Sequence, residues 1–294
     1  MTAPFGEVLT AIVTPFTADG AVDYGALWRL AKYLVASGSD GNVVAGTTGE
    51  SPTLTHEENV AVFKAVVEAV GGSANVVAGT GTNDTAATIE LTEQAAAVGC
   101  DGAMVVTPYY SKPPQRGLAR HFTAVADATE LPLILYNIPG RTARLIEIPT
   151  LAELAAHPRI VAVKDAVDDV VFTSRSLEAF GDQMAVYSGS DHLTLPMISA
   201  GAVGVISVAS HLVGPAVKRM VVAARSGDLE TASRLHRRML PLFDALFLEP
   251  NPIPVKGALG RAWEPVGDPR LPLLPALPET IDAVMAALGR AQEA

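Results

Sequence analysis

One lysine of this sequence stands where an amine can do covalent chemistry. Lys164 ends an apolar run, residues 160–163, and acidic and polar residues follow it. A lysine at the end of a buried strand keeps its stem in apolar packing, and desolvation there disfavours a charged ammonium. A neutral amine in a dry pocket can attack a ketone and form a Schiff base. The alternative interpretation is a lysine whose head group simply reaches solvent.

Polar residues also follow other apolar runs. The segment 46–51 has two threonines between glycines, so it either offers hydroxyl and N–H donors to a carboxylate or forms a tight turn before a helix. Tyr136 ends the run before that of Lys164, and we expect its side chain to point near the lysine. Arg141 follows, and its guanidinium suits bidentate binding of a carboxylate, with a surface salt bridge as the alternative.

The other lysines are weaker candidates for this chemistry. Lys256 follows a short apolar stretch but lies outside the predicted strands, and the rest fall in helical patterns or a loop. We expect no metal site, because no histidine has a recognisable ligand spacing with a second histidine or a strand-end carboxylate. No glycine-rich nucleotide-binding signature is present.

Eight short apolar runs must position these residues. Each run is rich in Val, Ile or Leu, and most lack polar alternation, which is typical of strands covered on both faces. The runs are residues 8–14, 42–45, 75–78, 102–106, 131–136, 160–164, 184–188 and 202–208.

Helical patterns lie between and after these runs. Thr55 and Glu58 form a capping-box signature ahead of a helix, and Gly99 is a stop signal after another. Pro215 is expected near the first position of a further helix. The expected helical ranges are 57–70, 85–98, 117–128, 150–156, 229–247, 252–259 and 281–291.

The alternation of strands and helices predicts the α/β class and a (β/α)8 TIM barrel with a C-terminal helical appendage. Eight strand–helix units in about 220 residues fit such a barrel, whose usual size is about 250 residues. The predicted division is a catalytic barrel over residues 1–226 and a helical extension over residues 227–294. A doubly wound open sheet is the alternative, but it calls for a glycine-rich loop after the first strand.

The composition excludes several classes of partner. The chain has 294 residues, of which 49% are hydrophobic, so it can bury a large core. Its net charge of −10 argues against nucleic acid or an anionic membrane as a partner. Cys100 is the only cysteine, so no intrachain disulfide is possible. No apolar stretch is long enough to span a membrane and no signal-peptide pattern is seen, so we expect a cytoplasmic location.

Four motifs together resemble the dihydrodipicolinate synthase/N-acetylneuraminate lyase superfamily. They are the threonine loop 46–51, the segment 107–110 with its two tyrosines, the segment 136–139 and Lys164. The resemblance extends from residue 6 to about residue 260 and includes the proline-rich segment 249–256. It implies a (β/α)8 barrel with C-terminal helices, a homotetramer built from tight dimers, and chemistry that needs no cofactor.

The resemblance also implies a reaction and the residues that catalyse it. A member of this kind condenses pyruvate with L-aspartate-4-semialdehyde to 4-hydroxy-tetrahydrodipicolinate in lysine and diaminopimelate biosynthesis. Lys164 would form the Schiff base with pyruvate, and Tyr136 would relay protons beside it. Thr47 would link Tyr136 to Tyr110, which would reach into the site of the adjacent subunit.

Further residues match the substrate contacts of the family. The resemblance implies that Thr48 holds the carboxylate of pyruvate and that Arg141 binds the carboxylate of the aldehyde. Gly189 and Ile206 would contribute backbone contacts near the site. Two positions beside the pocket depart from the family pattern, because residues 167–168 replace a glycine-containing turn and Ser190 replaces an aspartate.

A regulatory site is implied as well, in a degenerate form. Feedback-sensitive members of the family bind lysine at the dimer interface, and the matching residues are Ser51, His56, Asn83 and Tyr109. Ala87 stands where a glutamate would hold the lysine ammonium, and Asn59 replaces a histidine. Losing a charged partner in a desolvated site costs about 2–5 kcal/mol, so we predict weak or absent inhibition by lysine.

Two other functions compete with this interpretation. One is a pyruvate-dependent aldolase of the same superfamily acting on a sugar acid or another keto acid, although such enzymes generally lack an arginine in the context of Arg141. The other is a catalytically inactive barrel with a binding or regulatory role. The joint presence of Lys164, Tyr136, Thr47 and Tyr110 argues against it.

Overall fold

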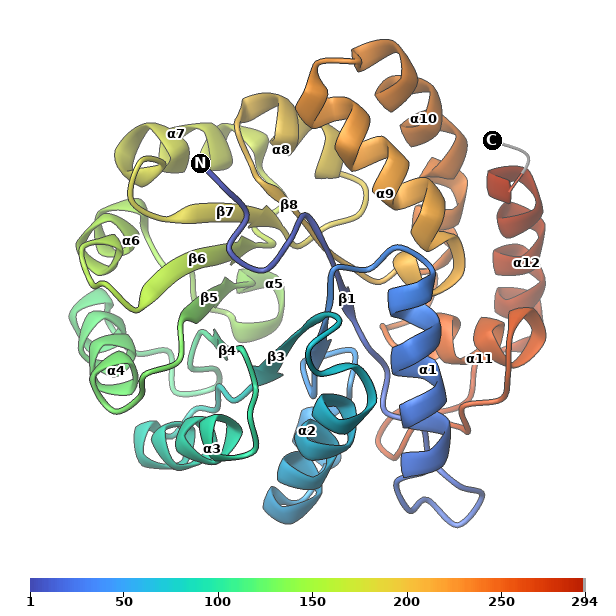
Figure 1. Ribbon diagram of the computed structural model, residues 1–294, viewed down its shortest axis with the longest axis horizontal. Helices are drawn as coiled ribbons and strands as arrows, with labels where there is room; N and C mark the ends of the chain where they lie inside the picture. Colours follow the sequence, from blue (N-terminus) through green and yellow to red (C-terminus); the bar gives the residue numbers. More distant parts are fainter. Residues whose placement is uncertain (293–294) are drawn as a thin grey trace.

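Eight parallel strands close into a barrel at the centre of the molecule. The computed structural model of the chain describes residues 1–292. The strands follow one another in chain order, and β1 pairs with β8 to close the ring (Figure 1). The strands are β1 (Val8–Ala11), β2 (Gly41–Val44), β3 (Asn75–Gly79), β4 (Gly102–Val106), β5 (Leu133–Asn137), β6 (Ile160–Asp165), β7 (Ala185–Ser188) and β8 (Gly204–Ser207). The predicted TIM barrel and its eight strands are confirmed, and the open-sheet alternative is wrong.

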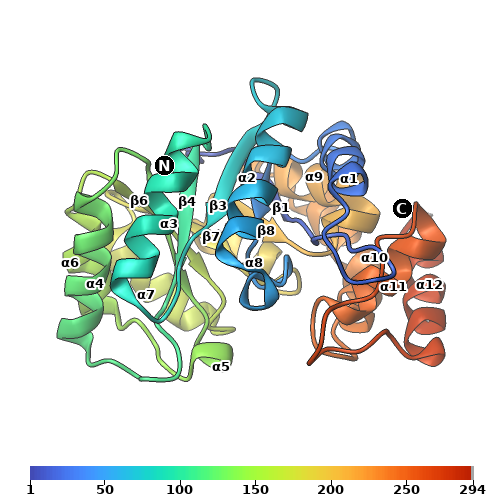
Figure 2. The same cartoon turned by 90° about the horizontal axis from the view of Figure 1, so that it is seen from below.

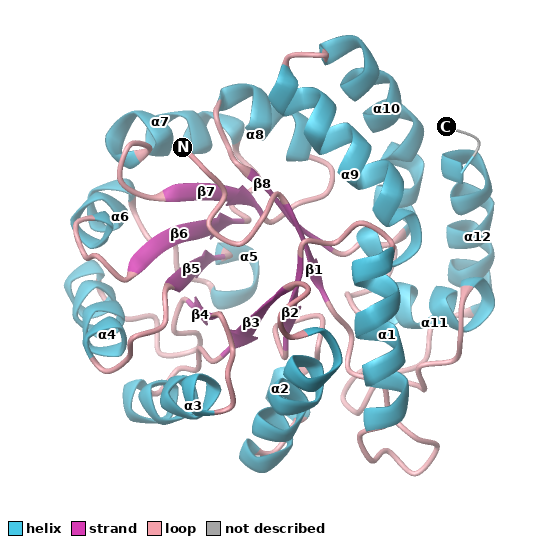
Figure 3. Ribbon diagram, viewed as in Figure 1, coloured by secondary structure: helices cyan, strands magenta, loops and turns pink. Residues whose placement is uncertain are grey.

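Helices surround the barrel on the outside (Figure 3). They are α1 (Tyr24–Ala36), α2 (His56–Val70), α3 (Thr85–Ala97), α4 (Gln115–Asp127), α5 (Pro139–Thr142), α6 (Ile148–Ala155), α7 (Val170–Phe180), α8 (Thr194–Ala200), α9 (Ser210–Ser226), α10 (Leu229–Ala245), α11 (Ile253–Ala262) and α12 (Pro278–Gln292), with a 3₁₀ turn η1 (Ser51–Thr53) before α2. No predicted range covered α1, α7 or α8.

Local capping signals explain where several helices begin and end. The Thr55 hydroxyl accepts from the Glu58 N–H at 3.1 Å, and a Glu58 carboxylate oxygen accepts from the Thr55 N–H at 2.9 Å, so the capping box before α2 is confirmed. Gly99 follows α3 with a φ of +90°, a left-handed conformation that favours glycine. Pro215 lies just after a kink at Val213 that divides α9 into two helical parts, so its predicted place near the start of a helix is confirmed for the second part.

The strands bury side chains on both faces. Inward-facing residues fill the barrel, and they include Leu9, Met104, Ile134, Tyr187 and Ile206. Outward-facing residues of the same strands pack under the helices in two larger clusters. Burial on both faces explains the continuous apolar runs in the sequence.

The three C-terminal helices lie against one side of the barrel. Both α10 and α11 contact α9 and α12, and Figure 2 shows this group beyond α1 and α9. Apolar residues of these helices, such as Leu242, Val255 and Val284, belong to the same hydrophobic cluster as Val8 of β1. The division of the chain at residue 226 stays a prediction. Among residues 1–292, no helix is long and apolar enough to cross a membrane.

Candidate active site

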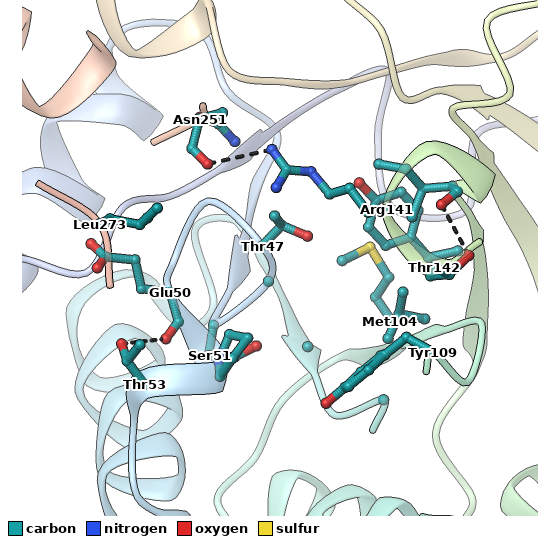
Figure 4. A pocket seen from close by; sticks show the side chains of 18 of the residues that line it. Thr47, Glu50, Ser51, Thr53, Met104, Tyr109, Arg141, Thr142, Asn251 and Leu273 are labelled. Carbon is teal, nitrogen blue, oxygen red and sulfur yellow. Dashed lines mark hydrogen bonds between the residues drawn. The ribbon is translucent and has the colours of Figure 1, made fainter. Parts of the chain in front are cut away.

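A cavity of about 330 Å³ opens at the carboxyl ends of the strands. This is the end at which (β/α)8 barrels place their active sites. Figure 4 shows Thr47, Ser51, Tyr109 and Arg141 around this space. The lining residues that the sequence predicted are Thr47, Ser51, Tyr109, Tyr136 and Arg141.

Lys164 and Tyr136 lie side by side, and Tyr136 lines the cavity, whereas Lys164 and Gly189 are not among the lining residues. Lys164 and Tyr136 are paired residues of neighbouring strands, β6 and β5. The Lys164 amine lies 4.2 Å from the centroid of the Tyr136 ring, so the expected proximity of the two side chains is confirmed. Lys164 is 5% exposed and Tyr136 is 4% exposed, so the amine and the phenol ring share a nearly water-free environment. Such a site suits nucleophilic attack by an amine on a carbonyl.

Gly189 leaves room for the lysine side chain. A Cβ atom at this position would lie 3.2 Å from Lys164 Cε and 2.7 Å from the Cβ of Ala166. A larger residue would therefore displace the Lys164 side chain. Ile206 is fully buried in the barrel interior with Tyr136 and Tyr187, and it does not line the cavity.

The acidic residue after Lys164 is held by its own hydrogen bonds. Asp165 is buried, and it accepts from the Thr173 hydroxyl at 2.7 Å and from the Val167 N–H at 3.0 Å. Burial raises the pKa of Asp165, and both hydrogen bonds oppose that shift. Asp168 has a φ of +61°, so it adopts the conformation that a glycine would favour at this departure from the family pattern.

The threonine loop between β2 and η1 is tightly folded. Thr47 lines the cavity, whereas Thr48 is buried beside it. The Glu50 N–H donates to the Thr47 carbonyl at 3.1 Å and closes the turn. A Cβ on Gly49 would lie 2.9 Å from the Cα of Ala45, so only glycine fits there. The loop is therefore fixed by packing and backbone hydrogen bonds, which suits a binding site for a small anion.

Asn251 connects the threonine loop to Arg141, and the sequence did not single it out. Its side-chain N–H donates to the Thr48 hydroxyl at 2.9 Å, and its backbone carbonyl accepts from the Arg141 guanidinium at 3.4 Å (Figure 4). Asn251 also lines the cavity. Its place in the proline-rich segment 249–256, which contributed to the resemblance, was the one available signal.

Tyr110 does not reach the cavity of its own chain. Its side chain is 90% exposed, and its φ of +69° is unusual for a bulky residue. Tyr109, its neighbour, lines the cavity instead. The predicted link from Thr47 to Tyr110 stays a prediction, because it assigns Tyr110 to the site of another subunit.

The residues that match a lysine site lie near the outer end of the cavity. Ser51 and Tyr109 line it, and Asn83 is exposed ahead of α3. His56 Nε2 lies 2.8 Å from the side-chain oxygen of Gln94 on α3. Asn59 turns back on its own helix, since its side-chain N–H donates to the Thr55 carbonyl at 2.9 Å.

No group of three or more His, Cys, Asp or Glu side chains among residues 1–292 is arranged to hold a metal ion. The hydrogen-bond donors that line the cavity are hydroxyls, a guanidinium, an amide and the phenols of Tyr109 and Tyr136. These groups bind carboxylates and carbonyl oxygens by donating hydrogen bonds. The arrangement therefore suits a small substrate that carries a carboxylate and a ketone.

Comparisons with known proteins agree with this geometry. The model of the dihydrodipicolinate synthetase family matches residues 4–291. The chain is 52% identical to the 4-hydroxy-tetrahydrodipicolinate synthase of Moorella thermoacetica, covering 97% of each chain. It is 55% identical to that of Prochlorococcus marinus, covering 96% of this chain and 93% of the relative. The structure is similar to that of the Cyanidioschyzon merolae enzyme with lysine bound, with a TM-score of 0.96, 45% identity and 99% of each chain covered. It is also similar to the Acinetobacter baumannii enzyme complexed with pyruvate, with a TM-score of 0.95, 40% identity, and 98% and 99% of the two chains covered.

Proposed function

This chain belongs to the dihydrodipicolinate synthetase family, and from that premise we propose that Lys164 is the amine that forms a Schiff base with pyruvate. The chain is a lyase that condenses pyruvate with L-aspartate-4-semialdehyde to 4-hydroxy-tetrahydrodipicolinate, in the biosynthesis of lysine and diaminopimelate. The single observation that carries the proposal is the buried Lys164 amine, 4.2 Å from the centroid of the Tyr136 ring, which lines the cavity.

The proposed reaction begins with attack of the Lys164 amine on the ketone of pyruvate. Water leaves and an iminium forms, which withdraws electrons from the neighbouring methyl group. Loss of a methyl proton gives an enamine, and the enamine carbon forms a bond to the aldehyde carbon of the second substrate. The amine of that substrate then displaces Lys164 and closes the ring, which frees the enzyme. We assign the exchange of these protons to Tyr136, because the centroid of its ring lies 4.2 Å from the amine.

The two carboxylates of the substrates have separate partners in this proposal. Thr48 binds the carboxylate of pyruvate, and its hydroxyl already accepts a hydrogen bond from Asn251. The Thr48 O–H is therefore free to donate to a carboxylate oxygen. Arg141 binds the carboxylate of the aldehyde, because its guanidinium lies at the wall of the cavity and makes one long hydrogen bond, at 3.4 Å, to Asn251.

We also propose that the active unit is a homo-oligomer, a tetramer built as a dimer of dimers, working in the cytoplasm. The exposed ring of Tyr110 supports the dimer, because an aromatic side chain that is 90% exposed on a constrained backbone suits insertion into a partner. The single cysteine, buried and unpaired, suits a reducing compartment.

Turnover with a choice of aldehydes tests the proposal. The purified protein is given pyruvate with either L-aspartate-4-semialdehyde or a sugar aldehyde of the kind used by sugar-acid aldolases, and the products are identified by mass spectrometry. We expect the cyclic product from the semialdehyde and negligible product from the sugar. A preference for the polyhydroxy aldehyde would assign the chain to the aldolases instead.

A further inference from the structure

A second lysine is buried at the rim of the same site. Lys256 of α11 is 3% exposed, and its ammonium donates to Glu50 Oε1 at 2.8 Å and to the carbonyl oxygens of Thr14 at 3.0 Å and Asp268 at 3.3 Å. It also lies 4.2 Å from the centroid of the Phe16 ring. Burial lowers the pKa of Lys256, and the carboxylate of Glu50 opposes that shift. All three donors of this ammonium have partners, so Lys256 is no rival to Lys164 as the nucleophile.

The partner of this lysine, Glu50, lies near the end of the threonine loop. Glu50 has a φ of +57°, a left-handed conformation that is costly for a residue with a Cβ and persists only when the surroundings hold it. Its N–H closes the turn on the Thr47 carbonyl at 3.1 Å. Figure 4 shows its carboxylate directed away from Thr47, toward the segment that carries Leu273.

The second oxygen of Glu50 is held by the same C-terminal segment. Glu50 Oε2 accepts from the Arg270 N–H at 2.9 Å. The Arg270 guanidinium binds both carboxylate oxygens of Glu58, at 2.6 and 2.7 Å, and the Thr53 carbonyl at 2.7 Å. The C-terminal extension therefore binds the start of α2 and the end of the threonine loop through several hydrogen bonds and an ion pair.

We propose that Lys256 is a positioning residue for pyruvate, because it acts through Glu50 to hold Thr47 and Thr48 in the geometry that receives the pyruvate carboxylate. This inference rests on the proposed function, since it concerns the same site. It assigns a positioning task to the helical extension, which supplies Lys256 to Glu50 and Asn251 to Thr48.

A purely structural role for the pair is the competing explanation. Both side chains are 1% exposed, and a buried ion pair often adds little net stability, because each charge loses its hydration. Replacing both charges with neutral groups of similar size is therefore compatible with folding. The double variant Glu50→Gln/Lys256→Met separates the structural role from the positioning role, since it removes both charges and leaves no unpaired charge in the interior.

The test measures steady-state kinetics for each substrate with the full-length protein. We expect Glu50→Gln/Lys256→Met to raise the KM for pyruvate about 10- to 100-fold, because small misplacements of binding groups carry costs of that size, while the KM for the aldehyde stays near wild type. Lys256→Arg should recover part of the loss. The matched control is Lys64→Met/Glu68→Gln, which removes an exposed pair 3.9 Å apart on α2.

The outcomes separate this inference from the proposed function. A folded double variant whose KM for pyruvate matches that of the control overturns the positioning role, and so does an equal rise in both KM values. If wild type and control both fail to turn over pyruvate with the semialdehyde, the proposed function fails instead.

Discussion

At the scale of single residues, the proposed covalent chemistry depends on two side chains of neighbouring strands. Lys164 supplies an amine, and Tyr136 places an aromatic ring 4.2 Å from it and a phenol within the same site. Burial of both residues matters, because a site closed to water protects a covalent intermediate from hydrolysis. The site therefore depends on a dry interior as much as on the identity of the two residues.

The phenol of Tyr136 gives the first prediction. Tyr136→Phe should keep the packing of the ring but lower kcat by about 10²–10⁴, the usual contribution of a proton-transfer group. Steady-state turnover of pyruvate and the semialdehyde measures this. Tyr33→Phe is the control, because Tyr33 stacks on Trp263 with the ring centroids 5.1 Å apart and does not line the cavity. A Tyr136→Phe enzyme as fast as the control would remove the proton relay from this residue.

A buried histidine gives a prediction about pH. His211 Nε2 accepts from the Val13 N–H at 3.2 Å, and Nδ1 donates to the Val208 carbonyl at 2.9 Å. Burial lowers the pKa of His211 to about 4, below an unfolded value of about 6.5. Between these pH values the unfolded chain binds more protons, so the free energy of unfolding falls as the pH drops, by up to about 1.4 kcal/mol per pH unit.

Urea unfolding at neutral pH and at about pH 5 measures this slope. We expect His211→Gln to be less stable than wild type at neutral pH but to lose less stability on acidification. If the free energy of unfolding depended equally on pH in the two proteins, His211 would be protonated to the same extent in the folded and unfolded states.

At the scale of elements, the barrel and its strand ends follow from local patterns. Buried parallel strands read as apolar runs, so β6 and its terminal Lys164 were visible in the sequence, as was the capping box of Thr55 and Glu58. The adjacency of β5 and β6 then places Tyr136 beside Lys164. These parts of the site could be predicted because each depends on residues close in sequence.

The contacts made by the C-terminal extension could not be predicted in the same way. The hydrogen bond between Asn251 and Thr48 joins residues 203 positions apart, and that between Lys256 and Glu50 joins residues 206 positions apart. No local periodicity encodes such pairs. The sequence showed Lys256 only as a lysine after a short apolar stretch outside the predicted strands, and the structure shows that it is buried.

The first turn of α3 gives a prediction about regulation. Wild type should show little inhibition by lysine at low millimolar concentration, because Ala87 offers no charge to the lysine ammonium. Ala87→Glu should increase sensitivity about tenfold or more, since a charged partner in a desolvated site is worth about 2–5 kcal/mol. Inhibition curves measure this, and Ala86→Glu, which adds the same charge on another side of the helix, is the control. Strong inhibition of wild type would show that another group binds the ammonium.

At the scale of the whole molecule, the proposed proton path needs a residue that one chain does not supply to its own cavity. Tyr110 is 90% exposed and does not line the cavity of its own chain. A twofold dimer would bring the same loop of each subunit to the site of the other, since such interfaces are self-complementary. The sequence could name Tyr110 only through the resemblance, because no pattern within one chain describes the surface of a partner.

Subunit complementation tests this arrangement. Tyr110→Phe and Lys164→Ala should each be nearly inactive alone, but a mixed dimer would contain one site with both native residues. Co-expression should therefore restore activity to about a quarter of the wild-type value if subunits of a twofold dimer mix at random. Co-expressed variants no more active than their separate preparations would mean that Tyr110 does not act across the interface.

The central claim is that Lys164 forms the covalent bond to pyruvate. The most direct test is reduction with borohydride in the presence of pyruvate. The wild-type enzyme and Lys164→Ala are treated in this way, and their peptides are then analysed by mass spectrometry. We predict a single reduced pyruvyl adduct, on the peptide that contains Lys164, and none in the variant. An adduct on Lys256 or another lysine, or no adduct in an enzyme that still turns over, would contradict the account.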